Sequence, residues 1–128
     1  MVMIDPASYH RYDGVTEAFV SLDAQGVASL YRRIQPLCDR AYEELGLPGG
    51  TFEDALARAF GRLLAVRVPS GPIEVVPDEA VYKFADPDLE ASSPAAKHLI
   101  RMGPANAGRV QEKLRELARA MGVQPSSP

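Results

Sequence analysis

The residues that could do chemistry in this 128-residue chain are few and scattered. The run Asp86-Pro87-Asp88-Leu89-Glu90 places three carboxylates at alternate positions, a pattern that occurs in calcium loops. An EF-hand loop also needs a central glycine and a distant bidentate glutamate, and neither is present here. We therefore interpret the run as a loop leading into a helix start, where acidic side chains suit the helix dipole. No metal site is predicted.

The two histidines and the single cysteine do not form a reactive group in the sequence. His10 and His98 lie far apart, and neither has a second His or Cys three or four residues away. Cys38 falls on a predicted apolar stripe, which favours a buried, unreactive thiol. The chain also lacks the G-x-S-x-G, H-E-x-x-H, Walker and G-x-G-x-x-G motifs. We predict no catalytic residue and no cofactor.

The composition is that of an ordinary globular domain. Hydrophobic residues make up 46% and charged residues 24% of a chain whose length suits one domain. A net charge of -3 argues against a nucleic-acid binder, and one cysteine excludes an internal disulfide framework. The apolar runs are too short to span a membrane.

Apolar residues recur at helical spacing over most of the chain, with capping residues at the expected starts. Asp23, Thr51 and Ser93 read as N-caps, and Pro36 predicts a kink inside the second helix. The prediction is an all-α, single, compact, bundle-like domain of about five helices. The expected helices cover about residues 8–22, 24–45, 52–68, 94–103 and 104–121.

Prolines interrupt the helical pattern between residues 69 and 94. The segments 73–76 and 81–84 are short, β-branched and aromatic, so residues 73–84 form either a small β-hairpin or a long ordered loop across the helices. We expect the domain to cover residues 8–122, with flexible ends at 1–7 and 123–128.

The mild net charge hides two opposed blocks. Residues 74–90 carry six acidic and one basic residue, whereas residues 97–119 carry six basic and two acidic residues. We expect the acidic loop to pack beside the basic helices; a basic face for an acidic partner is the alternative.

Tyr82, Lys83, Phe84 and Arg101 form the most informative cluster. Tyrosine and arginine anchor interfaces because each buries a large body while keeping a polar group. The same residues also pin loops to a core, and the sequence favours this structural role.

Two stretches, YKFADPDLE at 82–90 and KHLIRMGPANA at 97–107, resemble the C-terminal half of a bacterial family called domain of unknown function 3014. Leu30-Tyr31, Pro36-Leu37, residues 41–46 and residues 71–73 fit the same family, so that the resemblance covers about residues 9–121. Five candidate binding residues match its motif: Tyr82, Asp86, Glu90, Arg101 and Asn106.

The resemblance implies no activity, because the members are uncharacterised. Longer relatives carry an N-terminal hydrophobic anchor and a linker, which implies the periplasmic face of the inner membrane. A full-length chain without that anchor would be cytoplasmic.

Three functions follow from these observations, in descending order. The first is a non-enzymatic module that binds a protein partner in the cell envelope through the candidate residues. The second is a small-molecule or lipid-binding domain with an interhelical pocket among Tyr31, Tyr42, Phe60 and Arg101. The least favoured is a hydrolase that uses Asp86 and Glu90 as acid and base. The sequence leaves a homodimer open.

Overall fold

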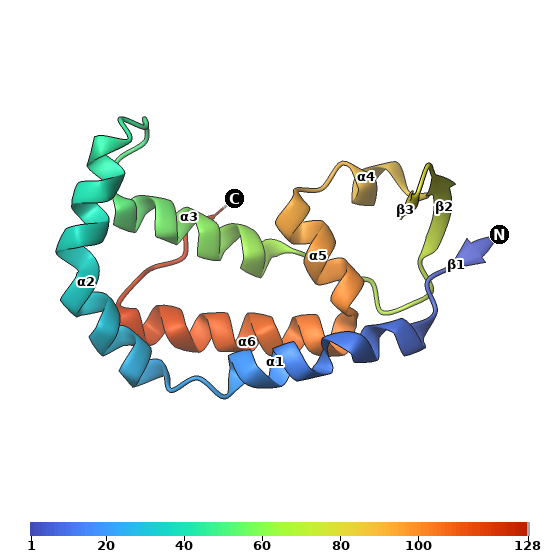
Figure 1. Ribbon diagram of the computed structural model, residues 1–128, viewed down its shortest axis with the longest axis horizontal. Coiled ribbons are helices and arrows are strands. Elements are labelled where there is room, and N and C mark those ends of the chain that lie inside the picture. The colour runs from blue at the N-terminus through green and yellow to red at the C-terminus, as the bar shows by residue number, and fades with distance from the viewer. Residues whose placement is uncertain (128) are drawn as a thin grey trace.

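The computed structural model describes residues 1–127 and confirms a mostly helical domain. Its helices are η1, a 3-10 helix, and α1 to α6, and three short strands form one small sheet (Figure 1). The bounds are β1 Val2–Met3, η1 Pro6–Tyr12, α1 Asp13–Val20, α2 Ala24–Glu44, α3 Phe52–Ala65, β2 Glu74–Asp78, β3 Val81–Phe84, α4 Pro87–Glu90, α5 Pro94–Met102 and α6 Pro104–Met121.

Helix α6 is the centre of the arrangement. It contacts α1, α2, α3 and α5, while α2 stands across the ends of α3 and α6 (Figure 1). The sheet lies at the opposite end of the molecule from α2. Phe60, Leu114, Leu117 and Ala118 form the main core, and Val123 closes it after α6 ends.

The segment 73–84 is a hairpin. Strands β2 and β3 pair antiparallel with Asp78 opposite Val81, and Glu79 adopts a left-handed backbone (φ 53°) in the two-residue turn. The sequence analysis did not foresee that β1 adds a third strand through Val2 opposite Val75. Phe84 and Ile100 bury one side of the sheet against α5, which gives the strands the packing that an isolated hairpin lacks.

The predicted helix starts at Asp23, Thr51 and Ser93 are confirmed. Each side chain accepts a hydrogen bond from a backbone N–H in the first turn. At Thr51 the bond is reciprocal, because the Asp54 carboxylate accepts from the Thr51 N–H. Helix α2 runs through Pro36 without a break, as its unchanged apolar pattern indicates.

Two local predictions need correction. The first helix is not one α-helix over 8–22: Asp5 caps a 3-10 helix that begins at Pro6, and α-helical geometry covers only Asp13–Val20. Cys38 is half-buried and not buried, because the outer side of this part of α2 has no neighbour to cover it.

Both chain ends contact the domain, although the sequence analysis expected flexible ends at 1–7 and 123–128. Val2 and Met3 lie in the sheet, and Val123 is buried in the main core. The Ser126 N–H donates to the Ala57 carbonyl of α3 over 3.1 Å, next to Gly61, where a Cβ atom would have no room. Pro128 lies outside the described residues.

Candidate functional site

The five candidate residues lie in three places. Tyr82, Glu90 and Arg101 line one groove between β3 and α5, with a volume of about 590 Å³. Asp86 caps the short helix α4 by accepting from the Asp88 N–H over 2.9 Å. Asn106 lies instead at the start of α6, against η1. The family motif therefore does not form a single site.

In the groove, Glu90 and Arg101 complete the hydrogen bonding of an edge strand. The Ala85 N–H donates to the Glu74 carbonyl, so the alternation of an antiparallel pair turns the polar groups of Phe84 away from β2. Glu90 Oε2 accepts from the Phe84 N–H over 2.9 Å, and Arg101 Nη2 donates to the Tyr82 carbonyl over 2.8 Å. These side chains occupy the positions that an added strand would need.

The other charges in the groove are also paired. The Arg101 guanidinium lies 4.6 Å from the centre of the Phe84 ring, a cation–π contact. Lys97 Nζ lies 3.2 Å from Glu90 Oε1, and Lys83 Nζ lies 3.8 Å from Asp78 Oδ1. The pair Lys97–Glu90 joins the acidic loop to the basic helices, as predicted. The Phe84 N–H and then Lys97 lower the pKa of Glu90 below its usual value.

This lowered pKa also bears on the hydrolase hypothesis. A general acid at neutral pH needs a carboxyl group whose pKa is raised, and Glu90 has the opposite shift. Asp86 uses its side chain as a helix cap. No group of three or more His, Cys, Asp or Glu residues with the geometry of a metal site occurs within residues 1–127.

Asn106 belongs to a second cluster, which ties the N-terminal segment to α6. The buried Asn106 amide donates to the Tyr9 carbonyl over 3.1 Å and to Asp13 Oδ1 over 2.9 Å. His10 Nδ1 lies 3.0 Å from Asp13 Oδ2, on the same face of the chain three residues away. The amide of Asn106, and then His10, lowers the pKa of Asp13. His10 and Asp13 were not predicted, although their spacing was the one signal available.

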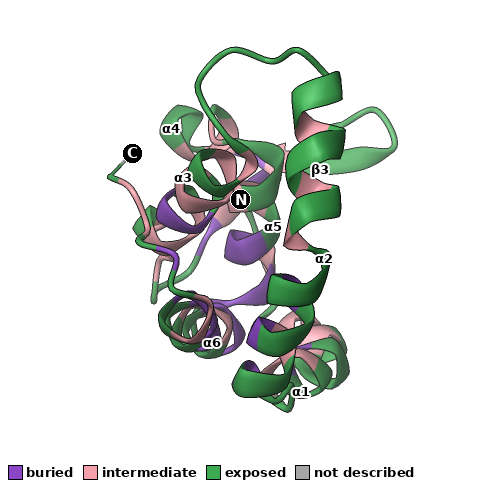
Figure 2. Ribbon diagram, turned by 90° about the vertical axis from the view of Figure 1, so that its left-hand side faces the viewer, coloured by how far each residue is buried: buried purple, intermediate pink, exposed green. Residues whose placement is uncertain are grey.

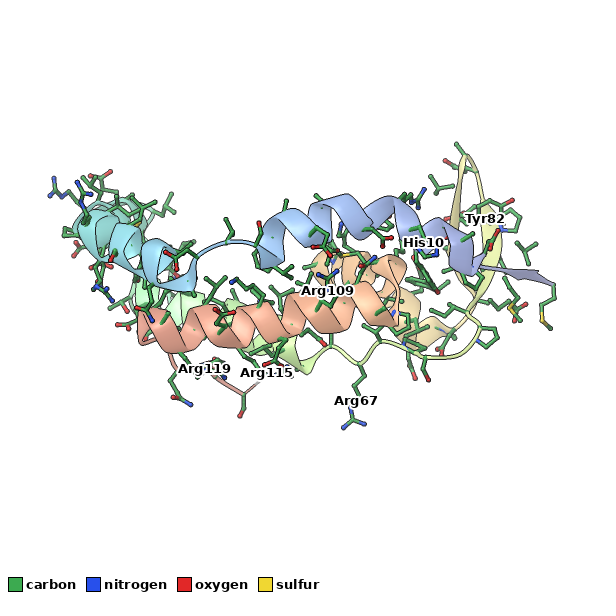
Figure 3. The ribbon with its side chains drawn as sticks, turned by 90° about the horizontal axis from the view of Figure 1, so that it is seen from below. His10, Arg67, Tyr82, Arg109, Arg115 and Arg119 are labelled. Carbon is green, nitrogen blue, oxygen red and sulfur yellow. The ribbon has the colours of Figure 1, made fainter. Side chains whose placement is uncertain are left out.

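A cavity of about 640 Å³ lies beside this cluster, between η1, the loop 70–72 and the junction of α5 and α6. Figure 3 shows His10 on η1, toward the end of the molecule that holds the sheet. Gly103 lies at the junction with φ 87°, and a Cβ atom there would come within 2.5 Å of the Tyr9 ring. The close approach of two distant segments thus forms part of the cavity wall.

The predicted pocket among Tyr31, Tyr42, Phe60 and Arg101 does not bring these residues together. Tyr31 and Phe60 are buried near α3, whereas Arg101 lies in the groove beside β3 at the other end of the molecule (Figure 1).

Comparison with protein families now places the chain. Residues 1–118 match the model of a family described as a protein of unknown function, DUF3014. The chain belongs to this family. The match extends to the N-terminal strand and so covers more than the C-terminal half that the motifs indicated. Neither a curated protein nor a solved structure matches the chain.

A third feature of this DUF3014 domain is the outward side of α2. Leu30, Leu37 and Leu45 are 57%, 61% and 68% exposed, and Ile34 is 40% exposed. They follow one another at three-, four- and eight-residue intervals, and with Ala41 they make one stripe. Figure 2 shows the exposed side of α2 turned toward the viewer. No helix within residues 1–127 is both long and apolar enough to cross a bilayer.

Proposed function

We propose that this domain is a non-enzymatic protein-interaction module that binds an amphipathic helix of its partner along α2. The observation that carries the proposal is the apolar stripe Leu30, Ile34, Leu37, Ala41 and Leu45, exposed on an otherwise well-packed domain. Contiguous exposed apolar surface is typical of interaction sites. The stripe spans 15 residues, about 22 Å at the α-helical rise, which suits four turns of a partner helix.

The charges beside the stripe indicate which helix would fit. Arg33 and Arg40 lie seven residues apart along the edge of the stripe that faces away from the core, and neither makes an ion pair within residues 1–127. A partner helix with carboxylates at seven-residue spacing would complement both. A second copy of α2, packed antiparallel, would instead bring its own Arg33 and Arg40 to the same edge. We therefore propose a partner of a different sequence.

The compartment in this proposal is the cell envelope. Its support is the resemblance to anchored relatives, and fractionation of the native host with antibodies against the domain tests it. Recovery in the cytoplasm alone would contradict this part of the proposal and leave the binding surface untouched.

The experiment for the binding surface is site-specific photo-crosslinking in the native host. A photoreactive amino acid replaces Leu37, which is exposed and should tolerate the change. We expect one dominant adduct, which Arg33→Glu with Arg40→Glu abolishes because the charge match is inverted. The matched control is Arg32→Glu, which lies about half a turn from the stripe and should keep the adduct.

Two results would overturn the binding surface. One is an adduct that the two arginine substitutions leave unchanged, because charge complementarity then has no part in binding. The other is a dimer of the isolated domain in sedimentation that Leu37→Asp dissociates, because a second copy would then cover the stripe.

A further inference from the structure

We propose that the cavity beside η1 is a binding site for small amines with an apolar body. This inference is independent of the α2 surface, since the cavity lies at the other end of the molecule (Figure 1). Its volume of about 640 Å³ lies within the roughly 300–1,000 Å³ of small-molecule sites.

The walls of the cavity are mostly apolar. Met3, Ile4, Pro6, the Tyr9 ring, Pro72 and Met102 contribute to them from three segments that are far apart in the sequence. Gly103, Pro104 and Ala105 complete the wall where α5 turns into α6. Such walls favour a ring or a short alkyl chain, which leaves water when it binds.

Charge then selects among apolar ligands. Asp13 is the carboxylate among the lining residues, and no lysine or arginine within residues 1–127 lines the cavity. Asn106 and His10 hold the two oxygens of this carboxylate, each through one contact. Because a carboxylate can accept about four hydrogen bonds and this one is 52% exposed, acceptor capacity remains.

An anionic ligand does not fit the same place, although α6 begins there. Its N-cap is Gly103, whose missing side chain leaves the helix start without a side-chain cap. A helix start of this kind favours negative charge. Asp13 already supplies that charge through its bond to Asn106, so a second anion would face a carboxylate. A protonated amine would instead be attracted to Asp13.

Three probes of one shape test the proposal: benzylamine, benzyl alcohol and benzoate. In ¹⁵N-labelled protein, amide shifts at Gly103, Ala105 and Asn106 should saturate with the amine and the alcohol. Benzylamine should bind about two- to fivefold more tightly than benzyl alcohol, the range of a half-exposed ion pair, and benzoate should bind weakest.

Two variants locate the effect. Asp13→Asn keeps an oxygen for the Asn106 amide but loses the charge, so the amine and the alcohol should bind equally. Ala105→Trp fills the cavity from an exposed position and should abolish the shifts from all three probes, with thermal unfolding unchanged. The matched control is Glu17→Gln, one turn along α1 and outside the cavity lining, which should preserve the order of affinities.

Several results would overturn the proposal. They are shifts that do not saturate, benzoate binding as tightly as benzylamine, or an amine preference that survives Asp13→Asn. Probe binding that survives Ala105→Trp would place the ligand elsewhere on the protein.

Discussion

The two hollows that adjoin α5 use charge in opposite ways. In the groove beside β3, Arg101, Lys97 and Glu90 are each engaged by groups of the protein itself. In the cavity beside η1, apolar walls surround a carboxylate that retains acceptor capacity. The comparison teaches that residue types typical of binding sites do not mark a site when their hydrogen bonds are used internally.

Gly103, in the cavity wall, is where a substitution should have the largest effect. Gly103→Ala places a Cβ within 2.5 Å of the Tyr9 ring at a φ of 87°. We expect a loss of about 2–4 kcal/mol in the free energy of unfolding, from steric overlap and backbone strain together. Urea denaturation measures it.

The matched control is Gly108→Ala in α6, where a Cβ atom would meet open space. Replacing a helical glycine by alanine should raise the free energy of unfolding by about 0.5–1 kcal/mol. Equal effects at the two glycines would show that the Tyr9 contact does not constrain the cavity wall.

Arg101→Ala tests whether the groove is structural. It removes the bond to the Tyr82 carbonyl and the contact with the Phe84 ring, so we expect a loss of about 1–2 kcal/mol in urea denaturation. Arg101→Lys should recover part of this loss, since it keeps the charge but not the planar guanidinium. Arg119→Ala on exposed α6 surface is the control, with an expected change within about 0.5 kcal/mol. An unchanged stability of Arg101→Ala would return the groove to the candidate binding sites.

Acid should weaken the groove through Glu90. Its pKa is lower in the folded protein than the usual 4.5, so its contribution to stability is present above pH 4.5. That contribution is lost as the pH falls through the lowered folded-state pKa. Glu90→Gln should therefore show a shallower decline in urea midpoint on acidification than the parent.

Lys97→Ala separates the two causes of that shift. The Phe84 N–H, which is the larger cause, remains in this variant, so the decline should lie between those of the parent and Glu90→Gln. Identical declines in all three proteins would contradict the role assigned to Glu90.

The smallest effect is expected for Tyr82→Ala. Its side chain is 52% exposed, and the bond to Arg101 uses the backbone carbonyl, which the substitution keeps. The free energy of unfolding should change by less than about 0.5 kcal/mol. If Tyr82→Ala destabilises the protein as much as Arg101→Ala, the phenol ring and not the guanidinium secures the hairpin.

Features that depend on neighbours in the chain could be predicted from the sequence. The caps at Asp23, Thr51 and Ser93 are confirmed because a cap and the N–H it accepts from lie within three residues. The start of the first helix was misplaced because Asp5 caps Pro6 in a 3-10 turn, and an apolar pattern does not distinguish that geometry from an α-helix.

The sequence by itself determined the helical class, the unbroken passage of α2 through Pro36 and the residues of the family motif. Only the tertiary structure decided that Asn106 leaves that motif to bind Asp13, 93 residues away, and that Arg101 covers a strand edge. It also decided which apolar residues of α2 stay exposed, since a periodic stripe does not state how much of its width a neighbour covers. The cavity beside η1 depends on three segments meeting, and no local pattern encodes such a meeting.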